Sequence, residues 1–531
     1  MISNQHWQIR PSCRERVGDT SMRIATKIFL LIFSLLQSAQ GGRYYLSTTG
    51  SDGQVGSIHA PWATFAYAMT RLRPGDSLLV REGVYREGEI WIRKAAGMGG
   101  ADGRFVTLMA YPGELVQLDG SRRIIVDADF MRIQGFTFCN TYSLDFPSWE
   151  SPGLSTNAEI LDNHFVGNFL LPIEFCGRNS LIEGNTIDSR DGSSHAIYLH
   201  YGRNNIIRRN RIIGTYKYGI HMYDEHKNED PAGFVREYHN IILEDNFITG
   251  CRTRAGIVVG TSADSPTPGV IMDSVVIRKN IITENATEGI LVKAWNGRIS
   301  HVDIYNNTIY QNGEAGIKID DAHEIRIYNN IIISSSAPHI DVDARSGKVT
   351  AQRNLYGPGS RRLKGVEDDM PLEADPLFDS TSGTGFSLLP GSPARDTGLP
   401  NNLEYSGSAP DLGASEASPT SGKPGEEPSE TGWLRFMPCY PNPLNGRTVI
   451  IGHLFKPFDI RVGIYDSLGR QITLALGRGD VKEHRLVDVL HVVEDVDQVV
   501  DLVAVDRAEV FEVEGFEEHA RGDEGLEALL R

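Results

Sequence analysis

Histidine and tyrosine side chains cluster in two short phrases, "HAIYLH" at residues 195–200 and "YGIHMY" at residues 218–223. A neutral imidazole can accept a proton and a phenol can donate one, so together they can act as base and acid. Nearby basic side chains could pair with a substrate carboxylate. The alternative is a ladder of hydrogen-bonded rings on a solvated face. The predicted catalytic residues are Tyr198, His200, His221 and Tyr223, and the predicted substrate-binding residues are His195, Asp224, Glu174, Arg208, Arg211 and Lys217.

A second cluster combines lysines with aspartates further along the chain. Grouped carboxylates can hold Ca²⁺ through oxygen ligands, and a nearby lysine could then remove a proton next to a carboxylate that the metal neutralises. A salt-bridge ladder explains the pattern equally well, because Lys293 would stack on Asp320 and Lys318 on Asp341. The cluster predicts Lys293 and Lys318 as catalytic residues and Asp320, Asp341 and Asp343 as ligands of Ca²⁺.

Both clusters belong to a repeated phrase of alternating apolar residues, with Ile at positions 173, 197, 220, 257, 290, 317 and 340. Alternation with a period of two predicts short strands with one buried face. If each Ile points inward, the next and third-next residues point outward and form columns across neighbouring strands. One predicted column is Glu174, Tyr198, His221, Val258, Leu291, Lys318 and Asp341, and the other is Cys176, His200, Tyr223, Gly260, Lys293, Asp320 and Asp343.

A second phrase, apolar-x-x-Asn-x-apolar, alternates with the first. Its asparagines are 22, 25, 36, 34, 27, 23 and 24 residues apart from Asn163 onward, which is the period of a solenoid. Asparagine suits a bend, and its recurrence on every coil would let neighbouring amides form a ladder. Stacked coils with two short strands each predict a parallel β-helix. The asparagines are Asn163, Asn185, Asn210, Asn246, Asn280, Asn307, Asn330 and Asn354.

The two ends of this array resemble a known superfamily. Residues 44–87 are similar to the N-terminal cap and first coil of secreted right-handed parallel β-helix proteins of the pectate-lyase-like superfamily, and residues 375–398 and 411–416 are similar to their closing segment. The resemblance implies an all-β, right-handed parallel β-helix, but it selects no activity, because the superfamily contains lyases, hydrolases, epimerases and non-catalytic proteins. An N-terminal capping helix is expected from the apolar stripe of Trp62, Phe65, Ala68, Met69 and Leu72.

The net charge argues against some classes of partner, and the N-terminal segment predicts export. The net charge of −17 opposes binding to nucleic acid or to an anionic membrane. Residues 22–41 have two basic residues, a short apolar run and then small residues, which is the layout of a signal peptide. Residues 1–21 are a doubtful extension before it, and residues 42–415 are assigned to the β-helix. We expect a monomer that is secreted or attached to the cell surface.

The C-terminal part begins with a linker at residues 416–432 that is rich in Pro, Gly, Ser and Glu. Residues 433–477 then resemble the small β-sandwich sorting domains of exported proteins in some Gram-negative bacteria, through "YPNP" and "IYDSLGR". That resemblance implies a partner in secretion or surface-attachment machinery. Residues 478–531 are predicted to be an acidic tail, disordered or the product of a shifted reading frame.

These observations favour an exported protein whose partner is a polysaccharide. The leading hypothesis is a lyase that cleaves a uronate-containing glycan by β-elimination in a groove on the β-helix. An epimerase could use the same face, and a hydrolase would need two carboxylates, for which Glu174 and Asp224 are the candidates. The alternative from another class is a non-catalytic glycan-binding or surface protein.

Overall fold

The computed structural model describes most of the repeat region. The described residues are 41–417, apart from 121–122, 141–142, 147–154, 168–169, 191, 225–237, 263–269, 335–336 and 360, together with the backbone of six strands between residues 434 and 504. The chain divides into two units, Met1–Thr420 and Ser421–Arg531, and each is treated by itself. The predicted extension, nearly all of the signal peptide and most of the linker lie outside the described residues. None of the helices within those residues is long and apolar enough to cross a membrane.

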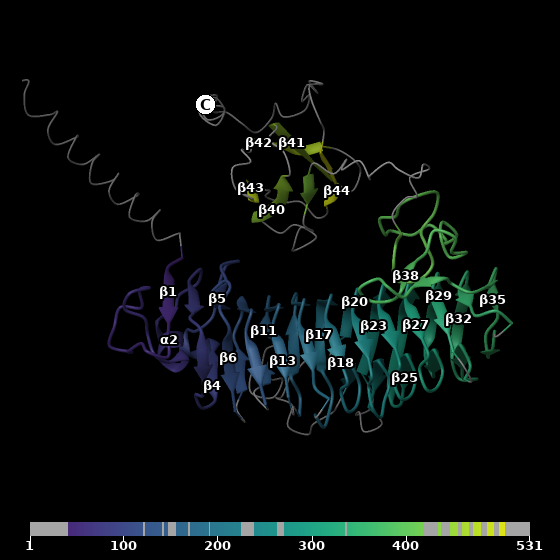
Figure 1. The fold of residues 1–531 in the computed structure, drawn as a ribbon, viewed down its shortest axis with the longest axis horizontal. Helices are drawn as coiled ribbons and strands as arrows, with labels where there is room; N and C mark the ends of the chain where they lie inside the picture. Colours follow the sequence, from purple (N-terminus) through teal and green to yellow (C-terminus); the bar gives the residue numbers. More distant parts are fainter. Residues whose placement is uncertain are drawn as a thin grey trace, which may run out of the picture. The chain divides into compact units, whose positions relative to one another are not determined.

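The first unit is a parallel β-helix (Figure 1). One sheet holds 24 of the described strands and another holds 12, and all of their pairings are parallel. The larger sheet contains β1 (Arg43–Leu46), β2 (Ser77–Val80), β4 (Ile90–Arg93), β5 (Val106–Ala110), β7 (Arg123–Asp127), β8 (Met131–Gln134), β10 (Ser143–Asp145), β11 (Ser155–Thr156), β12 (Glu159–Leu161), β14 (Ile173–Arg178), β15 (Leu181–Glu183), β17 (Ile197–Arg208), β19 (Ile220–Asp224), β20 (Tyr238–Glu244), β22 (Ile257–Thr261), β23 (Val270–Arg278), β25 (Ile290–Ala294), β26 (Gly297–Tyr305), β28 (Ile317–Asp320), β29 (His323–Tyr328), β31 (Ile340–Val342), β32 (Gly347–Gln352), β34 (Leu363–Lys364) and β35 (Asp368–Asp369).

The smaller sheet forms another side of the same coils. Its strands are β3 (Gly83–Tyr85), β6 (Val116–Asp119), β9 (Thr137–Cys139), β13 (His164–Val166), β16 (Thr186–Asp188), β18 (Arg211–Ile213), β21 (Phe247–Thr249), β24 (Ile281–Thr283), β27 (Thr308–Tyr310), β30 (Ile331–Ile333), β33 (Leu355–Tyr356) and β36 (Leu372–Glu373). Three short elements lie outside these sheets: helix α2 (Phe65–Arg71), the 3₁₀ turn η1 (Lys94–Ala96) and a hairpin of β37 (Phe378–Asp379) with β38 (Ser387–Leu388).

The larger sheet joins two sides of the coil through β17. Its first residues pair with β19, whereas Gly202 and the residues after it pair with β20. The chain turns between these two halves, where Gly202 and Asn204 have positive φ values of 147° and 54°. Residues at the start and at the end of β17 therefore face different sides of the β-helix.

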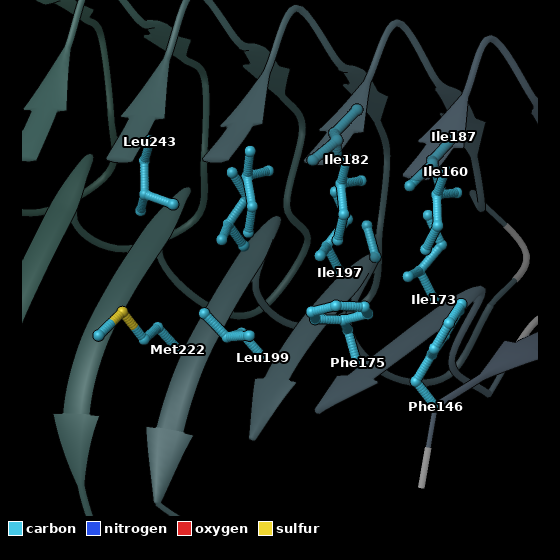
Figure 2. Packing of buried hydrophobic residues seen from close by; sticks show 14 of the residues in the cluster. Phe146, Ile160, Ile173, Phe175, Ile182, Ile187, Ile197, Leu199, Met222 and Leu243 are labelled. Atoms are coloured by element: carbon cyan, nitrogen blue, oxygen red, sulfur yellow. The ribbon is translucent and has the colours of Figure 1, made fainter. Parts of the chain in front are cut away.

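The interior is a stack of apolar side chains that repeats from coil to coil. Phe146, Phe175, Leu199 and Met222 lie in successive coils and are all fully buried (Figure 2). Burial of apolar surface is the main stabilising contribution to folding, and each coil supplies it only when its neighbours are present. The alternating pattern of the sequence therefore becomes a continuous core.

Helix α2 belongs to the N-terminal end of this core, as predicted. Phe65, Ala68 and Met69 are buried, and the side chain of Thr64 accepts a hydrogen bond from the backbone N–H of Tyr67 at the start of the helix. Glu87 accepts two further bonds from the first free N–H groups of the helix. Such capping satisfies donors that have no partner within the helix.

The predicted asparagine ladder is confirmed. In each coil, the side-chain oxygen of one asparagine accepts bonds from both the backbone N–H and the side-chain amide of its counterpart in the previous coil. For Asn185 and Asn210 these distances are 3.0 and 2.9 Å. The ladder contains all eight predicted asparagines and ends at Asp368, which accepts from Asn354 at 2.8 Å. Because these residues are buried, the ladder satisfies polar groups that water does not reach.

The second unit has six described strands in two antiparallel sheets. One sheet contains β39 (Leu434–Phe436), β40 (Arg447–Leu454) and β43 (Leu486–Val492), and the other contains β42 (Gln471–Arg478), β41 (Asp459–Asp466) and β44 (Val499–Ala504). Strands β43 and β44 lie in the segment predicted to be an acidic tail. The sorting role and the domain boundaries remain predictions.

Candidate functional site

The first outward column of the sequence prediction is confirmed by the strand register. Glu174 pairs with Tyr198 and Tyr198 with His221, and the same line continues through each following strand to Asp341. Adjacent strands in a sheet are about 4.8 Å apart, so these side chains touch from coil to coil. The column changes in character along the β-helix, from rings to aliphatic residues and then to charges.

The second predicted column is wrong at its beginning. The register of β14 and β17 shifts after Phe175, so Cys176 pairs with Tyr201 and His200 has no opposite residue. Cys176 and Tyr201 are core residues. An extra residue of this kind is a β-bulge, which re-aims a side chain. Further along, Tyr223, Gly260, Lys293 and Asp320 do lie in register as predicted.

The histidines and tyrosines of the first cluster pack ring against ring, and we call them the ring stack. The imidazole of His221 lies 3.9 Å from that of His195, 4.4 Å from Tyr198 and 4.9 Å from Tyr223, as centroid distances. The ring of His200 lies 3.9 Å from Tyr198, and its Nε2 is 2.7 Å from Glu174 Oε1. The ring stack consists of His195, Tyr198, His200, Tyr218, His221 and Tyr223.

Burial sets the charge state of the ring stack. It lowers the pKa of His195 to about 3, and the positive charge of Lys217 acts in the same direction. It also holds the pKa of His221 well below the ordinary value, with His195 and His200 as further causes. Burial raises the pKa of Tyr218. At neutral pH these two imidazoles are therefore uncharged and this phenol is protonated.

One atom of the ring stack lacks a hydrogen bond. Nδ1 of His221 is buried and has no partner among the described residues. A buried polar atom without a partner costs about 1–3 kcal/mol. Such an atom is a functional candidate, because a substrate group could supply the missing partner. The His221 side chain therefore combines a neutral ring with unused hydrogen-bonding capacity.

Asp224 does not join the ring stack, contrary to the prediction. It is fully buried, and its Oδ1 accepts a 2.7 Å hydrogen bond from the hydroxyl of Tyr201, a core residue. Alternation along β19 places it on the opposite side of the strand from His221. Asp224 and Glu174 thus lie on opposite faces, which does not suit the paired carboxylates of a glycoside hydrolase.

The predicted basic binding residues divide between different sides of the β-helix. Arg208 lies beyond the turn of β17, in ion pairs with Glu183 at 2.9 Å and with Glu244 at 3.7 Å. Arg211 lies in the smaller sheet, with its guanidinium 4.5 Å from the ring centroid of Phe247. Only Lys217, which lowers the pKa of His195 and His221, lies close to the ring stack.

The second cluster is a network of ion pairs. Lys293 Nζ lies 2.7 Å from Asp320 Oδ2, as the ladder alternative predicts. Lys318 Nζ instead lies 3.3 Å from Glu288 Oε1. Partial burial is the largest single influence on the pKa of Lys318 and lowers it. The charge and hydrogen bond of Glu288 and the charges of Glu314 and Asp341 together outweigh burial, so the pKa is raised. A lysine with a raised pKa stays protonated and is a poor base.

The three predicted metal ligands already have cationic partners. Lys364 lies 3.0 Å from Asp341, and Arg345 lies 2.8 Å from Asp343 and also pairs with Asp320. In the described part of the chain no group of three or more His, Cys, Asp or Glu residues is arranged to hold a metal ion. Because lysine and arginine already neutralise these carboxylates, the observed arrangement does not support a Ca²⁺ site, which stays a prediction from the sequence.

Three residues beside these columns were missed by the sequence patterns. Tyr218 and Glu288 occupy equivalent positions, each two residues before the leading Ile of its strand. The predicted columns were counted only from that Ile onward, so they did not include these two residues. Trp295 directly follows β25 and meets Tyr223 edge to face, with ring centroids 5.6 Å apart. Extending the alternation backward by two residues from Ile220 and Ile290 would have predicted Tyr218 and Glu288.

Comparisons with known proteins agree with this architecture. Residues 137–263 and 227–356 match a family model described as "Right handed beta helix region". A curated relative, the uncharacterized protein YwoF of Bacillus subtilis (strain 168), is 23% identical over 453 residues, which cover 68% of this chain and 93% of the relative.

Solved structures with a similar fold include pectate lyase Pel9A, at 18% identity and a TM-score of 0.48, covering 71% of this chain and 96% of that one. The A-module of mannuronan C-5 epimerase AlgE6 from Azotobacter vinelandii has 15% identity and a TM-score of 0.35, covering 56% and 83%. These likenesses concern the fold alone. The repeat region of this chain is a right-handed parallel β-helix.

Proposed function

We propose that the protein is an exported lyase that cleaves a uronate-containing polysaccharide by β-elimination, with the ring stack as the site of proton transfer. The observation that carries the proposal is the neutral, buried imidazole of His221, which lies between tyrosine rings and whose Nδ1 has no hydrogen-bond partner among the described residues. Imidazole and phenol are the base and acid that this reaction needs.

The reaction balances with these groups alone. The base takes the proton from the carbon next to the uronate carboxylate, a double bond forms in the ring, and the glycosidic C–O bond breaks. The leaving oxygen takes a proton from an acid, for which Tyr198 and Tyr223 are the candidates. A lysine base is disfavoured, because Lys293 and Lys318 are both held in ion pairs.

A low pKa for His221 does not oppose this role. A nearby anion raises the pKa of a histidine. A bound uronate would therefore bring the imidazole closer to the range in which a base is effective. Lys217 is placed near His195 and His221 and could pair with the substrate carboxylate.

A second candidate function is non-catalytic glycan binding. Two observations favour it. The three histidines and Tyr198 of the ring stack are buried, with only Tyr218 and Tyr223 partly exposed, and the carboxylates of the second cluster are already paired. Under this hypothesis the rings stabilise neighbouring coils and recognition occurs elsewhere on the surface.

Ultraviolet absorbance of the unsaturated uronate product separates these candidates. The full chain is incubated with pectate, alginate and glycosaminoglycans, with and without EDTA. We expect rising absorbance on one of these polymers that is insensitive to EDTA, lowered about 10²–10⁴-fold by His221→Phe and unchanged by His301→Gln. The phenylalanine keeps an aromatic ring in the stack, and His301 is a matched control because it is exposed elsewhere.

Other outcomes would change the assignment. Activity that survives His221→Phe but is lost with EDTA and with Lys318→Met would move the chemistry to the second cluster. A folded protein with no product on any polymer would contradict the lyase and support the binding protein.

A further inference from the structure

Trp295 is an exposed aromatic side chain that is held rigidly beside the ring stack. It is 39% exposed, and it directly follows β25. Its backbone N–H donates a 3.1 Å hydrogen bond to the hydroxyl of Thr261, which is fully buried. The edge-to-face contact with Tyr223 has an interplanar angle of 78°. A single exposed aromatic is common, but this indole already packs against Tyr223 on an anchored backbone, so it has less conformational entropy to lose on binding.

A glycine makes room for this arrangement. Gly260 lies in register between Tyr223 and Lys293. A Cβ atom at Gly260 would lie 2.9 Å from the indole of Trp295 and 3.0 Å from the ring of Tyr223. Its φ is outside the left-handed region, so the backbone does not require glycine here. Glycine at this position leaves room for the rings of Trp295 and Tyr223, which pack over its Cα atom.

A cation completes the arrangement. Lys293 Nζ lies 4.7 Å from the centroid of the Trp295 ring and 2.7 Å from Asp320 Oδ2. An ammonium over an indole is a favourable cation–π contact. Because Asp320 also pairs with Arg345, its charge stays compensated if Lys293 turns to a ligand. A carboxylate could therefore compete for Lys293 at limited cost.

We propose that Trp295 and Lys293 form a binding subsite for an acidic sugar unit of a polysaccharide. The apolar C–H face of a pyranose ring stacks on the indole, and its carboxylate pairs with the ammonium. This inference rests on the proposed function for the class of polymer. Strands β19 and β25 are two steps apart in the sheet, about 10 Å, and Tyr223 belongs to both the ring stack and this subsite. One extended chain can reach both.

Binding is measured by calorimetry on the full chain, with an acidic oligosaccharide cut from the polymer that gives product, or with oligogalacturonate and oligoalginate if none does. A neutral xylo-oligosaccharide of equal length is the comparison. We expect Trp295→Ala to weaken binding of the acidic oligosaccharide about tenfold and Trp295→Phe to retain part of it. Lys293→Gln removes the preference for the acidic ligand and its salt dependence. Tyr405→Ala, which removes another exposed aromatic, leaves binding unchanged.

The outcomes separate this subsite from the lyase proposal. Binding that depends on Trp295, without any product, would sustain the subsite and contradict the lyase. Product formation together with binding that Trp295→Ala does not change would support the lyase and contradict the subsite. Failure of the folded chain to bind any of these oligosaccharides, or equal affinity for the acidic and neutral ones, would overturn the subsite as an acidic-sugar site.

Discussion

Replacing one rung of the asparagine ladder, Asn280→Ala, tests what holds the coils together. The Asn280 side chain is fully buried. Its oxygen accepts from the backbone N–H and the amide of Asn246 at 3.0 and 2.9 Å. Its nitrogen donates to the carbonyl oxygens of Leu243 and Arg278 at 2.8 and 2.9 Å, and to the side chain of Asn307 at 3.0 Å. Alanine removes all of these bonds at once.

The expected loss follows from these contacts. A typical intramolecular hydrogen bond contributes about 1 kcal/mol net, and an unsatisfied buried donor costs about 1–3 kcal/mol. The change leaves the backbone N–H of Asn246 and one N–H of its side-chain amide without their partner in the buried interior, while the amide keeps its 2.9 Å bond to the carbonyl of Ile207. Allowing for partial relaxation of the neighbouring coils, we expect the free energy of unfolding to fall by about 3–5 kcal/mol. This is a large fraction of the roughly 5–15 kcal/mol that stabilises a domain.

Urea unfolding of the full chain, followed by circular dichroism, measures this loss as a shift of the midpoint at constant slope. The matched control is Asn204→Ala, which removes exposed bonds of 2.9 Å to Asn179 and 3.0 Å from Asn240. Because water replaces those partners, we expect a loss of about 1–2 kcal/mol, mainly left-handed strain at Asn204. A loss below about 1 kcal/mol for Asn280→Ala, or equal losses for the two variants, would refute the reasoning.

Three further predictions concern charge and space. The carboxylate of Asp273 accepts a hydrogen bond from His301 and so raises the pKa of His301 above 6.5. This stabilisation is complete below pH 6.5 and is lost as pH rises through the folded pKa; an NMR titration midpoint at or below 6.5 would contradict this. Burial raises the pKa of Asp368 above 3.8, so the free energy of unfolding falls as pH rises from 3.8 through the folded pKa. Asp368→Asn should remove this pH dependence from denaturation curves. The same dependence of the free energy of unfolding on pH in the variant would speak against it. Gly260→Ala should displace the two aromatic rings above it and lower the free energy of unfolding by about 1–3 kcal/mol, measured as a lower Tm, whereas an unchanged Tm would show that the rings move freely.

The fold was predictable because the same two sequence phrases recur in successive coils. The asparagine phrase marks one position on every coil, and the alternating phrase marks one strand. The register of the first column follows from counting outward from Ile197 and its equivalents, and it holds in each later coil. A solenoid depends on contacts between neighbouring coils, so short-range patterns determine most of its architecture.

The site was predicted less well because it depends on departures from that regularity. Counting by twos assumes an unbroken strand, whereas a bulge shifts His200 and the turn at Gly202 carries Arg208 to another side. Asp224 is the last residue of β19, a correctly predicted strand, but its side chain lies on the inner face of that strand. Proximity in sequence is therefore a poor guide in a β-helix, where a few residues carry the chain around a corner.

Under the proposed function, one set of side chains in the ring stack would serve both stability and chemistry. The neutral imidazoles of His195 and His221 pack against each other without a counter-ion, so their burial is compatible with a dry site. Packing requires a flat ring at position 221, but proton transfer requires an imidazole. His221→Phe and His221→Ala should therefore differ in stability, with only alanine leaving a cavity, while both lose activity. If phenylalanine instead retained activity, the ring stack would be a structural ladder alone.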